Sequence, residues 1–140
     1  MFESTFALSD ASRVIAGVGL LTIVTIEFGG MFLLRIAAGK VPVTEFQKAF
    51  SRAGHAHAGV LVILSLVTLV LADATSLEGF WGWVARIAVP AAAVLMSGGF
   101  FAAMAGRGRT APNRFIAIVF AGAASLALGV VTLGVGLLIG

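Results

Sequence analysis

FIAIVFAGAASLALGVVTLGVGLLI, residues 115–139, contains no charged side chain and decides the fold class. A helix that crosses a hydrocarbon core about 30 Å thick needs about 20 predominantly apolar residues. Three further stretches meet this requirement, at residues 14–34, 54–72 and 84–105. The sequence therefore predicts an all-α polytopic membrane protein, a four-transmembrane-helix bundle that forms a single domain over residues 1–140.

The composition agrees with a chain embedded in a lipid bilayer. Of the 140 residues, 60% are hydrophobic and 11% are charged, and the mean hydropathy is +1.12. A soluble domain carries about 25% charged residues, so a water-soluble globule is excluded. The chain has no cysteine, which excludes disulfides, thiolate zinc sites and cysteine-held iron–sulfur clusters. The basic residues lie between the apolar runs, so no nucleic-acid partner is expected.

The distribution of these basic residues predicts an orientation. The connections at residues 35–53 and 106–114 hold seven of the nine Lys and Arg residues, whereas Arg13 and Arg86 are the only ones elsewhere. Cytoplasmic loops carry the excess of positive charge. We therefore expect both of these connections to be cytoplasmic, and both termini to lie outside a bacterial-type inner membrane.

Small residues mark one face of the fourth span. Ser125, Gly129, Thr132 and Gly136 follow one another at helical spacing. Small residues let another helix approach closely, either within the chain or from another subunit. The pair Gly98-Gly99 in the third span allows a similar approach, by a helix or by a flat ligand.

Glu27 is an acid inside the first apolar run. It precedes Leu34 by seven residues, which places it about 10 Å inside the expected cytoplasmic boundary. An ionised carboxylate at that depth costs several kcal/mol, so it should be protonated, paired or turned into a cavity. Glu27 is a candidate catalytic acid on this ground, with a structural partner role as the alternative.

The second span opens with Arg52-Ala-Gly-His55-Ala-His57-Ala-Gly59. Residues two apart on a helix point about 200° apart, so these histidines cannot chelate one ion together. One can face a ligand while the other faces a neighbouring helix or the interface. The small residues around them leave room for a large flat group. The alternatives are two interfacial histidines solvated by headgroups, a proton relay with Glu27, and ligation of a metal or heme by one histidine.

Heme suits this donor set better than zinc does. Zinc usually takes three or four protein ligands. Heme brings four nitrogens of its own, so one histidine is enough, and a cytoplasmic basic residue such as Arg52 can meet its propionates. The sequence thus favours heme b with one open iron position, able to act on a small hydrophobic ligand.

The stretch Ala56-His57-Ala58-Gly59 resembles the Ala-His-Ser-Gly stretch of the styrene oxide isomerase family, whose members are small four-span proteins. The resemblance covers most of the chain by layout and is specific over residues 52–59. It implies heme b with His57 as the axial ligand of the iron, His55 being the alternative, and Arg52 and Gly59 beside the cofactor. It also implies a homo-oligomer, a trimer in the family, and an isomerase activity in which ferric heme polarises an epoxide.

The chain departs from the family at positions that matter for the reaction. It has no tyrosine to match the family's catalytic tyrosine, and the family's asparagine falls on an apolar residue near Ile63. Glu27 matches nothing in the family pattern. Two other functions stay open: a non-enzymatic accessory subunit of a larger membrane complex, such as a respiratory one, and a proton pathway that uses Glu27 with His55.

Overall fold

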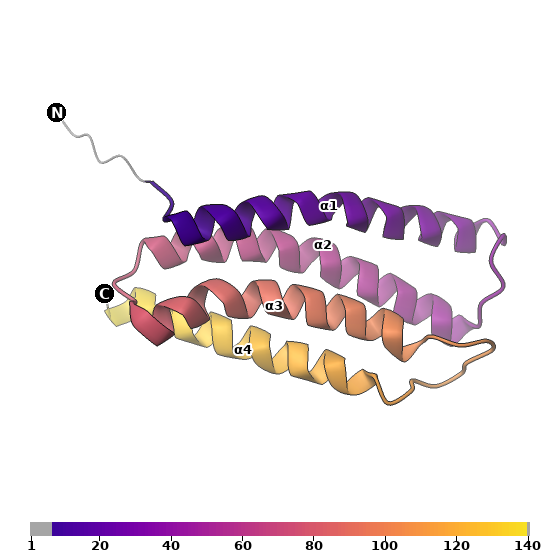
Figure 1. The fold of residues 1–140 in the computed structure, drawn as a ribbon. Coiled ribbons are helices and arrows are strands. Elements are labelled where there is room, and N and C mark those ends of the chain that lie inside the picture. The colour runs from indigo at the N-terminus through magenta and orange to yellow at the C-terminus, as the bar shows by residue number, and fades with distance from the viewer. Residues whose placement is uncertain (1–6, 140) are drawn as a thin grey trace.

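The computed structural model describes residues 7–139, which form four helices. These are α1 (Asp10–Ala37), α2 (Glu45–Asp73), α3 (Gly79–Ala103) and α4 (Ile116–Ile139). Each is long and apolar enough to cross a membrane, which confirms the predicted all-α, four-span architecture. Successive helices run antiparallel, with the α1–α2 and α3–α4 connections at one end and the α2–α3 connection at the other (Figure 1).

Helix α2 begins earlier than its apolar run predicts. Thr44 accepts a hydrogen bond from the Gln47 backbone N–H at 3.1 Å, and the Gln47 side chain accepts one from the Thr44 N–H at 3.2 Å. This capping box starts the helix at Glu45. Residues 45–53, predicted as part of the connection, are therefore helical. A search for apolar runs misses them because they include polar residues. Gln47 and Ser51 are nevertheless buried there, while Arg52 is exposed.

The helices do not pack equally against one another. The closest packing joins α3 to α4, followed by α2 to α3, whereas α1 lies mainly on α2 and barely touches α3. Within the described residues, α1 and α4 make no contact. The helices thus lie side by side in chain order, with α1 and α4 on the outside (Figure 1).

The small-residue face of α4 packs inside the chain. A Cβ added at Gly129 would lie 2.9 Å from Ala88 Cβ, and Ser125 Oγ donates to the Ala88 carbonyl at 2.8 Å. One added at Gly136 would overlap Leu77 of the α2–α3 connection. This confirms the prediction of close approach by another helix. Because these residues contact α3 and the connection before it, they are not available to join subunits.

Polar side chains fix the end at which α2 starts and α3 stops. Gln47 Nε2 donates to the carbonyls of Met104 at 3.1 Å and Gly106 at 2.7 Å. Asn113 Nδ2 donates to the Ala102 carbonyl at 2.8 Å. The last carbonyls of α3 are satisfied in this way, and the segment of α2 that carries the two histidines is held against α3.

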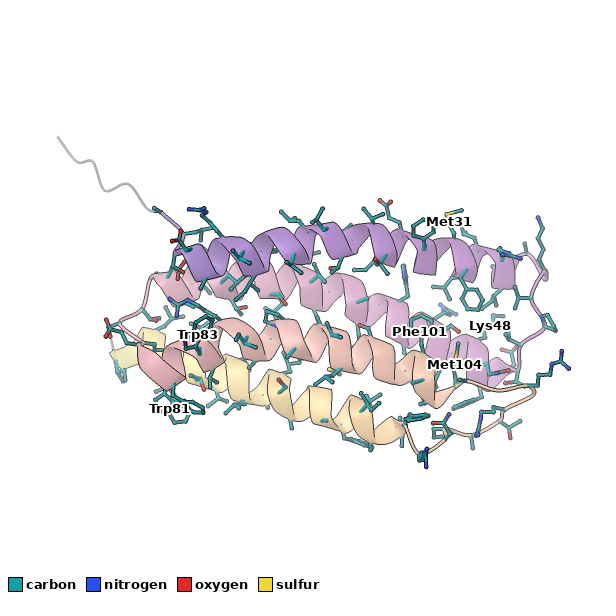
Figure 2. The ribbon with its side chains drawn as sticks, viewed as in Figure 1. Met31, Lys48, Trp81, Trp83, Phe101 and Met104 are labelled. Carbon is teal, nitrogen blue, oxygen red and sulfur yellow. The ribbon has the colours of Figure 1, made fainter. Side chains whose placement is uncertain are left out.

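A buried ion pair holds the opposite end. Asp73 Oδ1 lies 2.7 Å from Arg86 Nη2, and the two side chains are only 5% and 17% exposed. The Ser9 backbone N–H donates to the other carboxylate oxygen at 2.8 Å. This network ties the start of α1 to α2 and α3. Trp81 and Trp83 are exposed at the same end (Figure 2), as expected for aromatic residues at a membrane interface.

Candidate functional site

His55 lies against the glycine pair of α1. A Cβ added at Gly29 would lie 3.3 Å from His55 Nδ1, and one added at Gly30 would lie 3.4 Å from its Cε1. Larger residues at these two positions would crowd the imidazole. Gly29 and Gly30 therefore let α1 pass close over the ring, a role that the sequence did not reveal because it depends on which helix faces His55.

His55 also lines a groove between α1, α2 and α3, with a volume of about 300 Å³. Its walls include Gly29 from α1, Ala58 and Val62 from α2, and Gly98 and Phe101 from α3. Phe101 reaches from α3 toward α2 (Figure 2). The two glycines of Gly98-Gly99 have separate roles, since Gly99 packs against Val119 of α4 while Gly98 has open space beside it.

The same groove contains a hydroxyl without a partner. Ser97 Oγ is buried, and it makes no hydrogen bond with the described residues. Among the described residues, the His55 ring makes no hydrogen bond either. A buried polar group with no partner costs about 1–3 kcal/mol, and in a membrane no water is at hand to satisfy it. Ser97 is thus the buried polar group of this groove that has no hydrogen bond, and the side chains of His55 and Thr25 line the same groove.

His57 lies in a different environment. Its Nδ1 is 2.8 Å from the carbonyl oxygen of Ala53, one turn earlier on α2. Because a carbonyl oxygen can only accept, Nδ1 carries the proton and neutral His57 keeps its lone pair on Nε2. The ring packs on Phe100 of α3, with ring centroids 5.0 Å apart and a tilt of 35°. Nε2 makes no hydrogen bond with the described residues, so its lone pair is the one that can bind a ligand.

As their spacing predicted, the two histidines do not converge. His55 faces the glycines of α1, whereas His57 packs on Phe100. Within residues 7–139, no group of three or more His, Asp or Glu side chains is placed to hold a metal ion. Each histidine therefore offers a single protein ligand to whatever binds beside it.

The remaining candidate residues lie apart from these rings. Glu27 is exposed on α1 and is not among the side chains that line the His55 groove. No described side chain is within hydrogen-bond or ion-pair distance of it, so the structure does not bring Glu27 to His55 within one chain. Arg52 is exposed near the start of α2, and Gly59 has open space where a Cβ would stand.

Comparisons with known proteins add no family to this description. No protein-family model matches the chain, and no curated protein or solved structure matches it either. The resemblance to styrene oxide isomerases therefore rests on residues 52–59 and on the layout of the spans.

Proposed function

We propose that this protein binds heme b in the membrane, with Nε2 of His57 as the axial ligand of the iron. The observation that carries the proposal is the contact between His57 Nδ1 and the Ala53 carbonyl at 2.8 Å. Histidines that ligate metals almost always give their other ring N–H to a carbonyl or carboxylate, which fixes the tautomer and the direction of the ring. His57 has this arrangement.

The residues around His57 suit heme better than a bare ion. A bare ion needs several protein ligands, and the described residues offer no cluster of three. Heme needs one, because the porphyrin fills four positions. Ala56 and Gly59 leave space along α2, Phe100 gives an aromatic wall, and exposed Arg52 lies toward the loops, where it can meet a propionate.

The activity proposed with this cofactor is an isomerisation of a small hydrophobic epoxide. When bound, heme with one open position supplies a Lewis acid for the epoxide oxygen. The contribution of the chain is to fix the iron through His57 and to keep water away with apolar side chains such as Phe50 and Phe100. Since the chain lacks the family's tyrosine, heme binding is the primary proposal and the isomerase activity follows from it.

The absorption spectrum of the detergent-purified protein tests the proposal. We expect a Soret band in the wild type after growth with added heme precursor, loss of the band in His57→Ala, and its retention in His55→Ala. A thermal melt of each variant checks that the fold survives. A colourless wild type, or a band that survives in His57→Ala and disappears from His55→Ala, would contradict the proposed ligand.

The homo-oligomer, a trimer by the resemblance, belongs to the same proposal. Since Gly129 and Gly136 pack inside the chain, another surface must join the subunits. We place the interface on the outer face of α1, which is one of several exposed apolar faces. Its large apolar side chains are exposed, among them Phe28, Met31 and Leu34, and it carries Glu27. Met31 points away from the other helices (Figure 2).

The orientation is also a proposal, in which the α1–α2 and α3–α4 connections face the cytoplasm. The absence of native cysteine allows a direct test. Ser76 lies exposed in the α2–α3 connection and Ala111 in the α3–α4 connection. In intact spheroplasts, an impermeant maleimide should label Ser76→Cys, and it should label Ala111→Cys only after lysis. The reverse pattern would invert the topology.

A further inference from the structure

A continuous furrow runs between α1 and α3, with α2 as its floor. The groove at His55 shares Thr22, Val62 and Val94 with a second groove of about 230 Å³, which runs on toward Pro90. Val14, Ile15 and Pro90 in turn line a third groove that ends near Asp10. The furrow exists because α1 packs on α2 and barely touches α3.

The His55 groove and its continuation toward Pro90 differ in polarity. At one end are His55 and the orphan hydroxyl of Ser97, next to open space at Gly98. The continuation is lined mainly by aliphatic side chains such as Val18, Leu66 and Leu69. A ligand that fits both parts has a small polar head and a long apolar tail.

We infer that this furrow binds a neutral, membrane-soluble molecule with a carbonyl-bearing ring and an aliphatic chain, as in a prenylated quinone. The ring lies beside His55 and Ser97, and the chain follows the apolar continuation. An imidazole N–H and a hydroxyl both donate to carbonyl oxygens. Gly98 leaves open space there, and Phe101 gives a surface for stacking.

The charge of the groove favours a neutral head over an anionic one. None of the residues that line the His55 groove is Asp, Glu, Lys or Arg. Arg52 is on α2 nearby but does not line it. A phosphate or carboxylate placed there would be a charge in a low-dielectric medium without a counterion, which is costly. The inference does not rest on heme binding, because His55 and His57 face different neighbours.

Three decyl compounds test the ligand class on the full-length protein in detergent. The probes are a decyl-substituted benzoquinone, decylbenzene, which lacks the carbonyls, and decanoate, which carries a negative charge. Equilibrium dialysis should show the quinone bound at least about tenfold more tightly than the other two. Equal affinities would reduce the furrow to a non-specific lipid groove, and tighter binding of decanoate would assign it to an anionic lipid. Either result would overturn the inference.

A space-filling variant locates the site. A Cβ added at Gly98 would meet no atom within 4 Å, and Gly98 lines the groove, so Gly98→Leu should fold and fill the groove. We expect it to weaken quinone binding more than about tenfold. Gly17→Leu is the matched control, because Gly17 also has open space but does not line the furrow. Equal affinity in the two variants would overturn the inference.

Removal of the hydroxyl tests the polar end. Ser97→Ala should weaken quinone binding about fivefold, since it deletes one hydrogen bond. Ser125→Ala is the control: this α4 hydroxyl donates to the Ala88 carbonyl and does not line the furrow, so the affinity should stay unchanged. No difference between the two would contradict the role of Ser97.

One more variant separates this inference from the heme proposal. His57→Ala should keep the quinone affinity, and Gly98→Leu should keep the Soret band. Loss of the Soret band from Gly98→Leu would place the heme in the furrow and overturn the inference, while a colourless wild type that binds the quinone would leave it standing.

Discussion

The α3–α4 hairpin and helix α1 use glycine in opposite ways. In the hairpin, a Cβ added at Gly99 would lie 2.8 Å from the Val119 backbone nitrogen, and one added at Gly122 would lie 2.6 Å from Met96 Cγ. In α1, Gly17 has no atom within 4 Å of such a Cβ, and Gly29 and Gly30 approach only the His55 ring. Glycine brings the backbones of α3 and α4 together, whereas in α1 it either admits the His55 ring or faces open space.

This difference indicates which part of the protein can hold a ligand. Lipid gives no hydrophobic drive to press helices together, so close packing of small residues decides which helices associate firmly. The hairpin has that packing and serves as the rigid part. Helix α1 lacks it, and the unpartnered groups of His55 and Ser97 lie in the furrow that results. Binding sites are commonly formed in such less stable regions.

The largest effect on stability is expected at the buried ion pair of Asp73 with Arg86, which holds the start of α1. Asp73→Asn removes the charge that Arg86 faces and weakens the bonds that Ser9 donates. Breaking one partner of a buried pair should lower the free energy of unfolding by about 3 kcal/mol. Chemical denaturation in detergent measures the loss.

The exposed pair of Asp10 with Arg13 provides the control for Asp73→Asn. These side chains are 93% and 67% exposed, so Arg13→Gln should change stability very little. Similar losses in the two variants would show that the start of α1 is not held by Asp73.

A somewhat smaller effect is expected in the hairpin. Gly122→Ala places a methyl group 2.8 Å from the Met96 backbone nitrogen, so α3 and α4 must separate. We expect a loss of about 2 kcal/mol from this overpacking. Gly134→Ala, in the same helix but with open space, should be neutral or slightly stabilising, since alanine favours the helix. Equal stability of the two variants would mean that the hairpin is not closely packed.

The smallest effect on folding is expected at Glu27, on the outer face of α1. Glu27→Leu should leave the melting temperature of the single chain nearly unchanged, because no described residue pairs with this carboxyl group. It should lower the oligomeric mass seen by light scattering if α1 joins the subunits. Glu78→Gln, in the α2–α3 connection, is the control. An unchanged mass in Glu27→Leu would remove α1 from the proposed interface.

Much of the fold could be predicted from the sequence, because apolar runs and helical spacing are local properties. The four spans, the face with Ser125 and Gly129, and the divergence of His55 from His57 all follow from them. The start of α2 could not be predicted from hydropathy, since it depends on the Thr44 cap and on burial against the α3–α4 connection.

Less of the candidate site could be predicted from the sequence, because the site depends on which helices pack against one another. No local pattern tells that Gly29 covers His55 or that Ser97 lies in the same groove. The pair of Asp73 with Arg86 was not predicted either, although opposite charges at the facing ends of two consecutive spans are a signal for it. The sequence predicts which residue types matter, and the packing decides their partners.

The most direct test of the account is the absorption spectrum of His57→Gly, recorded before and after imidazole is added. We predict a Soret band in the wild type, its loss in His57→Gly, and its return when free imidazole takes the place of the missing ligand. A Soret band of full intensity in His57→Gly without imidazole would contradict it.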